Sequence, residues 1–155
     1  MSAPESSLPR AAIVQRAGEW DGQEQDRAVL SHDDRFLRRK VLTSDAGLRF
    51  LVDLAATTSL NAGDALLLAD GRRIAVVPAV EELLEITGPD LPRLAWHIGN
   101  RHMPCQIEAT RLVIQRDHVI RAMLEQLGAQ LREVEEPFTP EGGAYGHGRT
   151  HSHAH

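Results

Sequence analysis

The chain has 155 residues, of which 42% are hydrophobic and 25% are charged, a composition typical of a globular protein. Its formal net charge of -5 at pH 7 argues against a nucleic-acid or anionic-membrane partner, since both surfaces favour a basic protein face. No uninterrupted apolar run approaches the roughly 18 residues of a membrane span, and the N-terminus lacks a secretory signal, so we expect a cytoplasmic protein.

The first half of the sequence predicts short strands. Residues 1–10 are rich in Ser and Pro and are expected to be disordered. Further along, Asp70 and Gly71 separate two apolar runs, which predicts a hairpin with a type I′ turn because Asp-Gly tolerates the positive φ angles that this turn needs. Residues 11–77 are therefore predicted to form a small all-β domain, with no helical period in its sequence.

After Pro78 the pattern changes. A strand over 79–88 precedes a helix over 90–99, for which Asp90 is the expected N-cap and Gly99 the expected C′ residue. Two strands around a tight turn are expected within 105–116.

A second helix follows, capped by Asp117 and ended by Gly128, and a final strand is expected over 129–138. The order β-α-β-β-α-β predicts a ferredoxin-like arrangement over residues 78–138, with two helices on one antiparallel sheet. The fold class is therefore α+β, and residues 139–155 are expected to form a flexible His-rich tail.

His102 lies in the loop "NRHMP" after the first predicted helix, where a side chain projects from a rigid element without joining the core. A lone exposed histidine is most often an ordinary surface residue. In a two-fold dimer, however, a residue near the axis meets its own copy, so one histidine per chain becomes two converging ligands. His102 is therefore a candidate for half of a metal site.

The other histidines before the tail, and the single cysteine, are weaker candidates for metal ligands. His97 falls at the rim of the apolar face of its helix and turns away from His102. His118 is expected to face solvent, and His32 sits in an Asp-rich turn. Cys105, the only cysteine, begins an apolar strand, which favours a small buried hydrophobe over a thiolate ligand.

The C-terminal end carries four more histidines in ten residues: His147, His151, His153 and His155. Their surroundings are too rich in Gly and polar residues to fold alone. Imidazole suits borderline cations, so Ni²⁺, Zn²⁺ and Cu²⁺ are all candidate metals. A purification tag is normally an uninterrupted run of histidines, and the interspersed residues here favour a natural metal-binding tail.

Several motifs together resemble a known family. They are "WHIGNRHMPCQI" (96–107), "RDHVIRAMLEQLG" (116–128) and "EEPFTPEGGAYGHG" (135–148), followed by the His-rich end. This combination resembles the urease accessory proteins that serve as nickel metallochaperones. The resemblance covers the C-terminal half almost continuously, and the hairpin region 63–77 fits more loosely.

The resemblance implies an N-terminal β domain similar to a peptide-binding domain of heat-shock co-chaperones, and a C-terminal domain that dimerises and binds metal. It implies that His102 is the central ligand, paired across the dimer axis, and that tail histidines complete the coordination. His147 is the first of these, and His151, His153 and His155 follow. Arg116 departs from relatives that have a histidine there, which weakens a secondary surface site at His118.

The predicted function is a non-enzymatic carrier that binds Ni²⁺ as cargo at the interface of a homodimer. The resemblance implies a urease accessory GTPase as recipient and the urease apoprotein complex as destination. An alternative is a peptide-binding co-chaperone with incidental metal binding. A metallohydrolase fits worse, because nothing near His102 supplies fixed carboxylates and an open catalytic position. Neutral imidazole is the ligand form, so nickel affinity is expected to fall below about pH 6.5.

Overall fold

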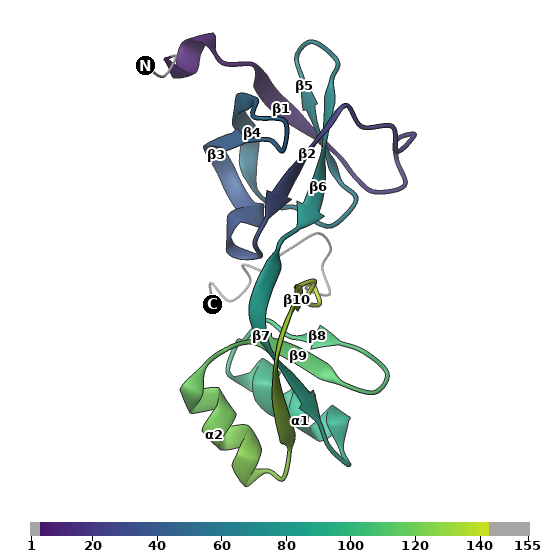
Figure 1. Cartoon of the computed structure of the whole chain (residues 1–155), viewed down its shortest axis with the longest axis vertical. Helices are drawn as coiled ribbons and strands as arrows, with labels where there is room; N and C mark the ends of the chain where they lie inside the picture. The colour runs from purple at the N-terminus through teal and green to yellow at the C-terminus, as the bar shows by residue number, and fades with distance from the viewer. Residues whose placement is uncertain (1–3, 143–155) are drawn as a thin grey trace. The chain divides into compact units, whose positions relative to one another are not determined.

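The computed structural model describes residues 4–142, within which residues up to Pro78 form one compact unit and Ala79–Glu141 form a second (Figure 1). The first unit is built from strands and two short 3-10 turns, and the second contains both α-helices. The mixed α+β class predicted from the sequence is confirmed. Neither α-helix in the described range, at ten and nine residues, is long and apolar enough to cross a lipid bilayer.

The first unit contains one six-stranded sheet with the strand order β2-β6-β5-β1-β4-β3. Two neighbouring pairs, β1 with β4 and β2 with β6, are parallel, and the other pairs are antiparallel. Buried side chains such as Phe50, Leu66 and Ile74 form its core. The strands are β1 (Arg10–Gln15), β2 (Asp26–Leu30), β3 (Phe36–Thr43), β4 (Arg49–Ser59), β5 (Ala65–Leu68) and β6 (Arg73–Pro78).

The hairpin predicted at Asp70-Gly71 joins β5 to β6, but its turn is not type I′. Gly71 has a φ of 95°, whereas Asp70 does not share the positive φ that a type I′ turn requires. The Gly71 N–H donates to the Leu68 carbonyl over 2.9 Å, and the Leu68 N–H donates to the Arg72 carbonyl over 2.8 Å. This is the pattern of a type I turn followed by a left-handed glycine, which makes the loop one residue longer than predicted.

Residues 4–10 differ from the disordered stretch predicted for residues 1–10, of which residues 1–3 lie outside the described residues. Residues 5–7 form the 3-10 turn η1 (Glu5–Ser7), and β1 already begins at Arg10. The Pro9 carbonyl accepts a hydrogen bond from the Leu51 N–H at 2.8 Å, and Glu5 pairs with Arg39 at 2.9 Å. The Ser- and Pro-rich composition of this segment did not indicate this order, because the contacts are made with strands β3 and β4, which lie far along the chain.

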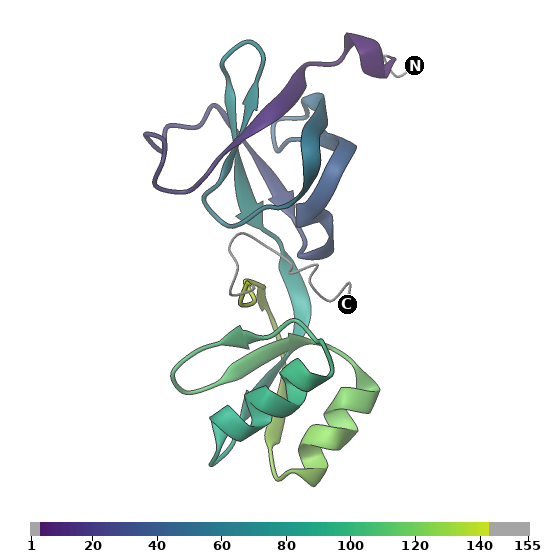
Figure 2. The same cartoon turned by 180° about the vertical axis from the view of Figure 1, so that it is seen from behind.

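The second unit has the predicted element order β-α-β-β-α-β. Its strands form a sheet in the order β10-β7-β9-β8, with every neighbouring pair antiparallel. Both helices cover the same face of this sheet (Figures 1 and 2). The elements are β7 (Val80–Thr87), α1 (Leu91–Asn100), β8 (Gln106–Ile107), β9 (Leu112–Gln115), α2 (His118–Gln126) and β10 (Gln130–Pro137).

Apolar side chains are buried on both faces of this sheet. On β7, Leu84 and Ile86 face the helices and join the larger core. Leu83 belongs to a separate cluster on the other face, formed with Val113 of β9, Val134 of β10 and Phe138. Because the sheet is buried on both sides at this point, the adjacent β7 residues Leu83 and Leu84 are both apolar and buried, although they point to opposite faces.

Candidate metal-binding segment

Helix α1 is a rigid support for the histidine-bearing segment. As predicted, Asp90 caps its N-terminus, where the side chain accepts a hydrogen bond from the Arg93 N–H at 3.2 Å. Leu94 and Ile98, four residues apart, are buried against the sheet. This packing fixes the position of the helix C-terminus, from which the loop to β8 departs.

The C-terminus of α1 is a Schellman motif whose C′ residue is His102. The Met103 N–H donates to the Ile98 carbonyl at 3.3 Å, and the His102 N–H donates to the Gly99 carbonyl at 2.9 Å. His102 has a φ of 59° and is the only non-glycine residue with a positive φ among residues 4–142. The prediction that Gly99 is the C′ residue is therefore wrong, because the helix continues through Asn100.

Helix α2 ends in the same motif with glycine in the equivalent place. The Ala129 N–H donates to the Leu124 carbonyl at 3.0 Å, the Gly128 N–H donates to the Glu125 carbonyl at 3.1 Å, and Gly128 has a φ of 87°. A side chain in this left-handed conformation costs roughly 1–2 kcal/mol, which glycine avoids. Non-glycine residues in sparsely populated conformations cluster at functional sites, so His102 stands out on backbone grounds alone.

The other two histidines near this segment lie on the helices themselves, His97 within α1 and His118 at the start of α2. His97 is half-buried and its ring meets that of Trp96 edge-on, with centroids 5.0 Å apart. Trp96 itself is 64% exposed. His118, the first residue of α2, is exposed as predicted. The helical period predicted the burial of both histidines correctly, with His97 at the rim of the apolar face and His118 in solvent.

Within residues 4–142, no group of three His, Cys, Asp or Glu side chains is arranged to hold a metal ion. Of the predicted ligands, this part of the chain contains His102, which is exposed. The remaining predicted ligands, His147, His151, His153 and His155, lie outside the described residues. The described structure thus shows one of the predicted metal ligands, His102, and the helix that supports it.

Cys105 lies three residues beyond His102 and packs against the core between the sheet and the helices. Burial raises the pKa of its thiol to about 11, and the negative charge of Glu141 acts in the same direction. The thiol is therefore protonated at neutral pH, whereas the thiolate is the form that binds metals. These features support the interpretation of Cys105 as a small buried hydrophobe.

We expect Cys105→Ala to leave nickel affinity unchanged within about twofold, because a protonated thiol contributes no ligand. Alkylation of the native protein should be slow at pH 7 and should accelerate steadily toward pH 11. Titration of nickel into both proteins, together with iodoacetamide labelling across this pH range, measures both effects. A tenfold loss of affinity in the variant would show that sulfur takes part in binding.

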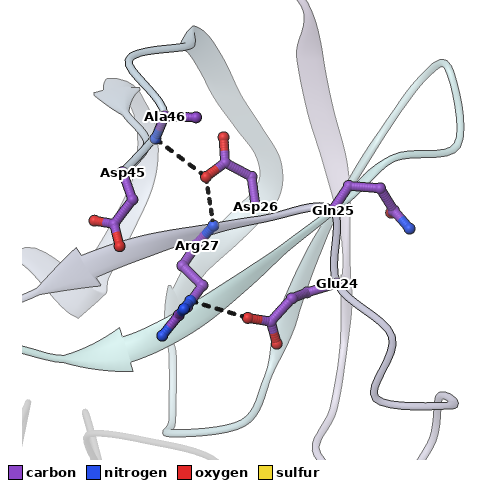
Figure 3. A pocket seen from close by; sticks show the side chains of 6 residues that line it. All are labelled: Glu24, Gln25, Asp26, Arg27, Asp45 and Ala46. Atoms are coloured by element: carbon purple, nitrogen blue, oxygen red, sulfur yellow. Dashed lines mark hydrogen bonds and ion pairs between the residues drawn. The ribbon is translucent and has the colours of Figure 1, made fainter.

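A shallow pocket of about 440 Å³ lies on the first unit and is lined by Glu24, Gln25, Asp26, Arg27, Asp45 and Ala46 (Figure 3). Two of its carboxylates already have partners. Asp26 accepts hydrogen bonds from the Arg27 and Ala46 N–H groups, and Glu24 pairs with Arg27 at 3.1 Å. The Ser44 hydroxyl also donates to Asp26, which lowers the pKa of that carboxyl. These bonds attach β2 to the turn after β3.

Sequence patterns missed two features of the second unit. The left-handed conformation of His102 gave no local signal, because Gly99 offered a more conventional helix end nearby. Residues 138–141, which the sequence assigned to the end of the last strand and to the tail, are attached to the sheet. Thr139 is hydrogen-bonded to Gln106, and the Glu141 N–H donates to the Cys105 carbonyl at 2.9 Å. The predicted tail boundary at residue 139 is therefore too early.

Comparisons with known proteins match both units. Residues 9–79 match the family model of the UreE urease accessory protein N-terminal domain, and residues 81–155 match that of the C-terminal domain. The urease accessory protein UreE of Ruegeria pomeroyi is 66% identical over 148 residues, which cover 96% of this chain and 99% of the relative.

Two further relatives carry the same name. The protein of Ruegeria sp. (strain TM1040) is 72% identical over 131 residues, covering 84% of this chain and 74% of the relative. That of Cereibacter sphaeroides is 58% identical over 150 residues, covering 97% of this chain and 82% of the relative. These matches confirm the resemblance found in the sequence motifs. The chain belongs to the UreE family of urease accessory proteins.

Proposed function

We propose that this chain is a nickel metallochaperone that acts in urease maturation. It binds Ni²⁺ where the His102 side chains of two copies meet across a two-fold axis, and His147 or a later tail histidine completes the coordination. Membership of the urease accessory family supports the role in maturation. The observation that carries the site is the exposed, left-handed His102 at the end of a well-packed helix.

Symmetry explains how one histidine per chain can serve as a metal site. Two copies of His102 near a two-fold axis supply two imidazoles on rigid supports, since each α1 is fixed by its own core. Trp96 on the same helix leaves a large apolar ring 64% exposed. Burial of this ring between subunits would remove apolar area from water, which supports a homodimer formed through this region.

Release of the metal favours such an open arrangement. A closed shell of four fixed protein ligands typifies structural sites, which retain their metal. Imidazoles from two chains and from the tail can instead be replaced one at a time by ligands of a recipient. The recipient is a urease accessory GTPase, and the destination is the urease apoprotein complex in the cytoplasm. Ni²⁺ is thus cargo, with Zn²⁺ and Cu²⁺ as competitors, and the protein is not an enzyme.

The fold suits this role. We assign residues 79–141 to the ferredoxin-like class, which is supported by the strand order β10-β7-β9-β8 and by two helices on one face. In this arrangement the end of α1 and the loop to β8 emerge together at one edge of the sheet. The first unit remains available for a peptide-like partner, which is the alternative function.

Urease activation at limiting nickel separates the two functions. We expect a protein with His102→Ala that also lacks residues 147–155 to leave urease no more active than when the accessory protein is absent. His118→Ala is the matched control, since it removes an exposed histidine from the other helix and should behave like wild type. Full activation by the doubly altered protein would instead favour a co-chaperone in which the histidines are incidental.

A further inference from the structure

The segment Phe138–Glu141, which we term the strap, crosses the face of the second sheet that the helices leave open. Phe138 has no exposed surface and packs with Leu83 of β7, Val113 of β9 and Val134 of β10. The strap therefore starts at β10, on one edge of the sheet, and runs over the two central strands.

Hydrogen bonds hold the far end of the strap at the opposite edge. The Gln106 side-chain oxygen on β8 accepts from the Thr139 N–H at 2.9 Å and from the Thr139 hydroxyl at 3.3 Å. The Glu141 N–H then donates to the Cys105 carbonyl at 2.9 Å. Both acceptors belong to the segment that begins at the end of α1, only three and four residues after His102.

The strap moves the chain both across the sheet and back along its strands. Three strand spacings, about 14 Å, separate β10 from β8. Pro137 lies opposite Val80, whereas Gln106 lies opposite Val113, which itself pairs with Glu85. The bond from the Glu141 N–H to the Cys105 carbonyl shows that the strap ends at the β8 edge, beside the loop that contains His102.

We propose that the strap positions the His-rich tail, so that the tail leaves the folded unit beside the His102 loop, and that Gln106 is a positioning residue for metal binding. The effect on metal binding rests on the proposed nickel-carrier function, whereas the placement of the strap does not. The connection from Glu141 to His147 has six Cα-to-Cα steps, a reach of at most about 22 Å. Without the strap, the connection would begin at Pro137 on the far edge and would have ten steps.

A shorter free segment that starts closer to its target raises the effective concentration of the tail histidines at the metal. For a polymer tether in general this concentration falls roughly as the −3/2 power of length, so a lengthening from six to ten steps costs about twofold. The displacement of the starting point by the width of the sheet adds to this loss. The strap also accounts for Phe138 and Thr139 of the motif "PFTPEGG" (137–143), which ligand chemistry alone leaves unexplained.

The geometric part is tested on metal-free protein. A nitroxide is attached to a cysteine introduced by Gly148→Cys in a Cys105→Ala background, and broadening of the amide signals of residues 101–103 is measured by NMR. Chains that carry both the nitroxide and the NMR isotope are diluted into protein that carries neither, so that the broadening measured arises within one chain. We expect strong broadening with the intact strap, and a reduction of about twofold or more in Gln106→Ala.

Gln115→Ala is the matched control, because Gln115 lies on the adjacent strand β9 and its side chain bonds to Glu81 at 3.2 Å. It should broaden these signals like the parent. A Phe138→Ala variant, checked by its amide spectrum for an intact fold, removes the anchor of the strap and should reduce broadening further. Unchanged broadening in both Gln106→Ala and folded Phe138→Ala would overturn the proposal.

The contribution of Gln106 to metal binding is tested by measuring nickel affinity in a double-mutant cycle of Gln106→Ala and removal of the tail. We expect Gln106→Ala to weaken binding about threefold or more in the full chain and to have no effect in a chain that ends at residue 146. Equal weakening in both chains would show a general structural effect and contradict a positioning role. If wild type binds no nickel, the carrier function fails, while the broadening experiment still decides whether the strap positions the tail.

Discussion

Replacement of His102 by glycine is expected to abolish tight nickel binding while raising the free energy of unfolding by about 0.5–1 kcal/mol. His102 occupies the left-handed C′ position of α1 with a φ of 59°, a conformation that glycine adopts without steric penalty. The gain is smaller than the full left-handed penalty because glycine also loses more backbone entropy on folding. Affinity should fall at least about a hundredfold, since even partners that only orient metal ligands contribute about 10–100-fold.

Two variants serve as controls for this result. His102→Ala should also lose nickel but should gain no stability, because alanine keeps the left-handed penalty. Gly128→Ala introduces that penalty at the end of α2 and should lower the free energy of unfolding by about 1 kcal/mol. Denaturant unfolding and nickel titration of all three proteins measure these effects. A glycine variant that binds nickel like wild type would remove His102 from the site.

Replacement of Arg111 by methionine is expected to lower the free energy of unfolding by about 2 kcal/mol at pH 7, between the values for exposed and buried ion pairs. The Arg111 guanidinium lies 2.7 Å from Glu136, 3.0 Å from Glu85 and 3.0 Å from Glu108. Its side chain is only 19% exposed. Its loss leaves three carboxylates close together, with Arg132 as the remaining partner of Glu85.

The pH dependence of this effect has a defined sign. Hydrogen bonds from Arg111 lower the pKa of Glu108 and of Glu136, and Arg132 followed by Arg111 lowers that of Glu85. A lowered carboxyl pKa stabilises the fold above the unfolded-state value of about 4.3, and this contribution is lost as pH falls through the folded-state pKa. The variant lacks much of this contribution, so the difference between the two proteins should shrink in acid.

Urea unfolding of both proteins at pH 7 and near pH 3.5 measures the difference. Arg132→Met is the matched control, since its side chain is 69% exposed and its removal should have a much smaller effect. An unchanged unfolding midpoint for the Arg111 variant at pH 7 would contradict a stabilising role for this network. A loss of equal size at both pH values would show that packing of the Arg111 side chain, and not its charge, is responsible.

Local sequence signals predicted much of the fold. The caps Asp90 and Asp117 accept hydrogen bonds from helix N–H groups as expected, and Gly128 ends α2. These features depend on residues within one or two helical turns, which is the range over which propensity and capping act. Packing was harder to predict. The helical period places Val119 beside Ile120 and Leu124 on one apolar face of α2, yet Val119 is 53% exposed while the other two are buried in the core.

Features that depend on contacts between residues distant in the chain could not be predicted from local sequence patterns. The bond between Gln106 and Thr139 joins residues 33 positions apart, so the attachment of the strap could not be inferred from composition. The polar, Pro-containing character of "FTPEGG" suggested a free tail instead. Similarly, the left-handed conformation of His102 depends on where the core allows α1 to end, and Gly99 gave a misleading local signal. The histidine itself was nevertheless singled out by its loop position and by family resemblance.

The most direct test of the interface site is calorimetric titration of Ni²⁺ into the wild-type protein, with molar mass measured by light scattering on the same samples. We expect a dimer that binds one tightly held nickel ion per two chains, because one site needs His102 from both. Tight binding of one or more ions by each chain of a monomeric protein would contradict an interface site and would place the nickel on the histidines of a single chain.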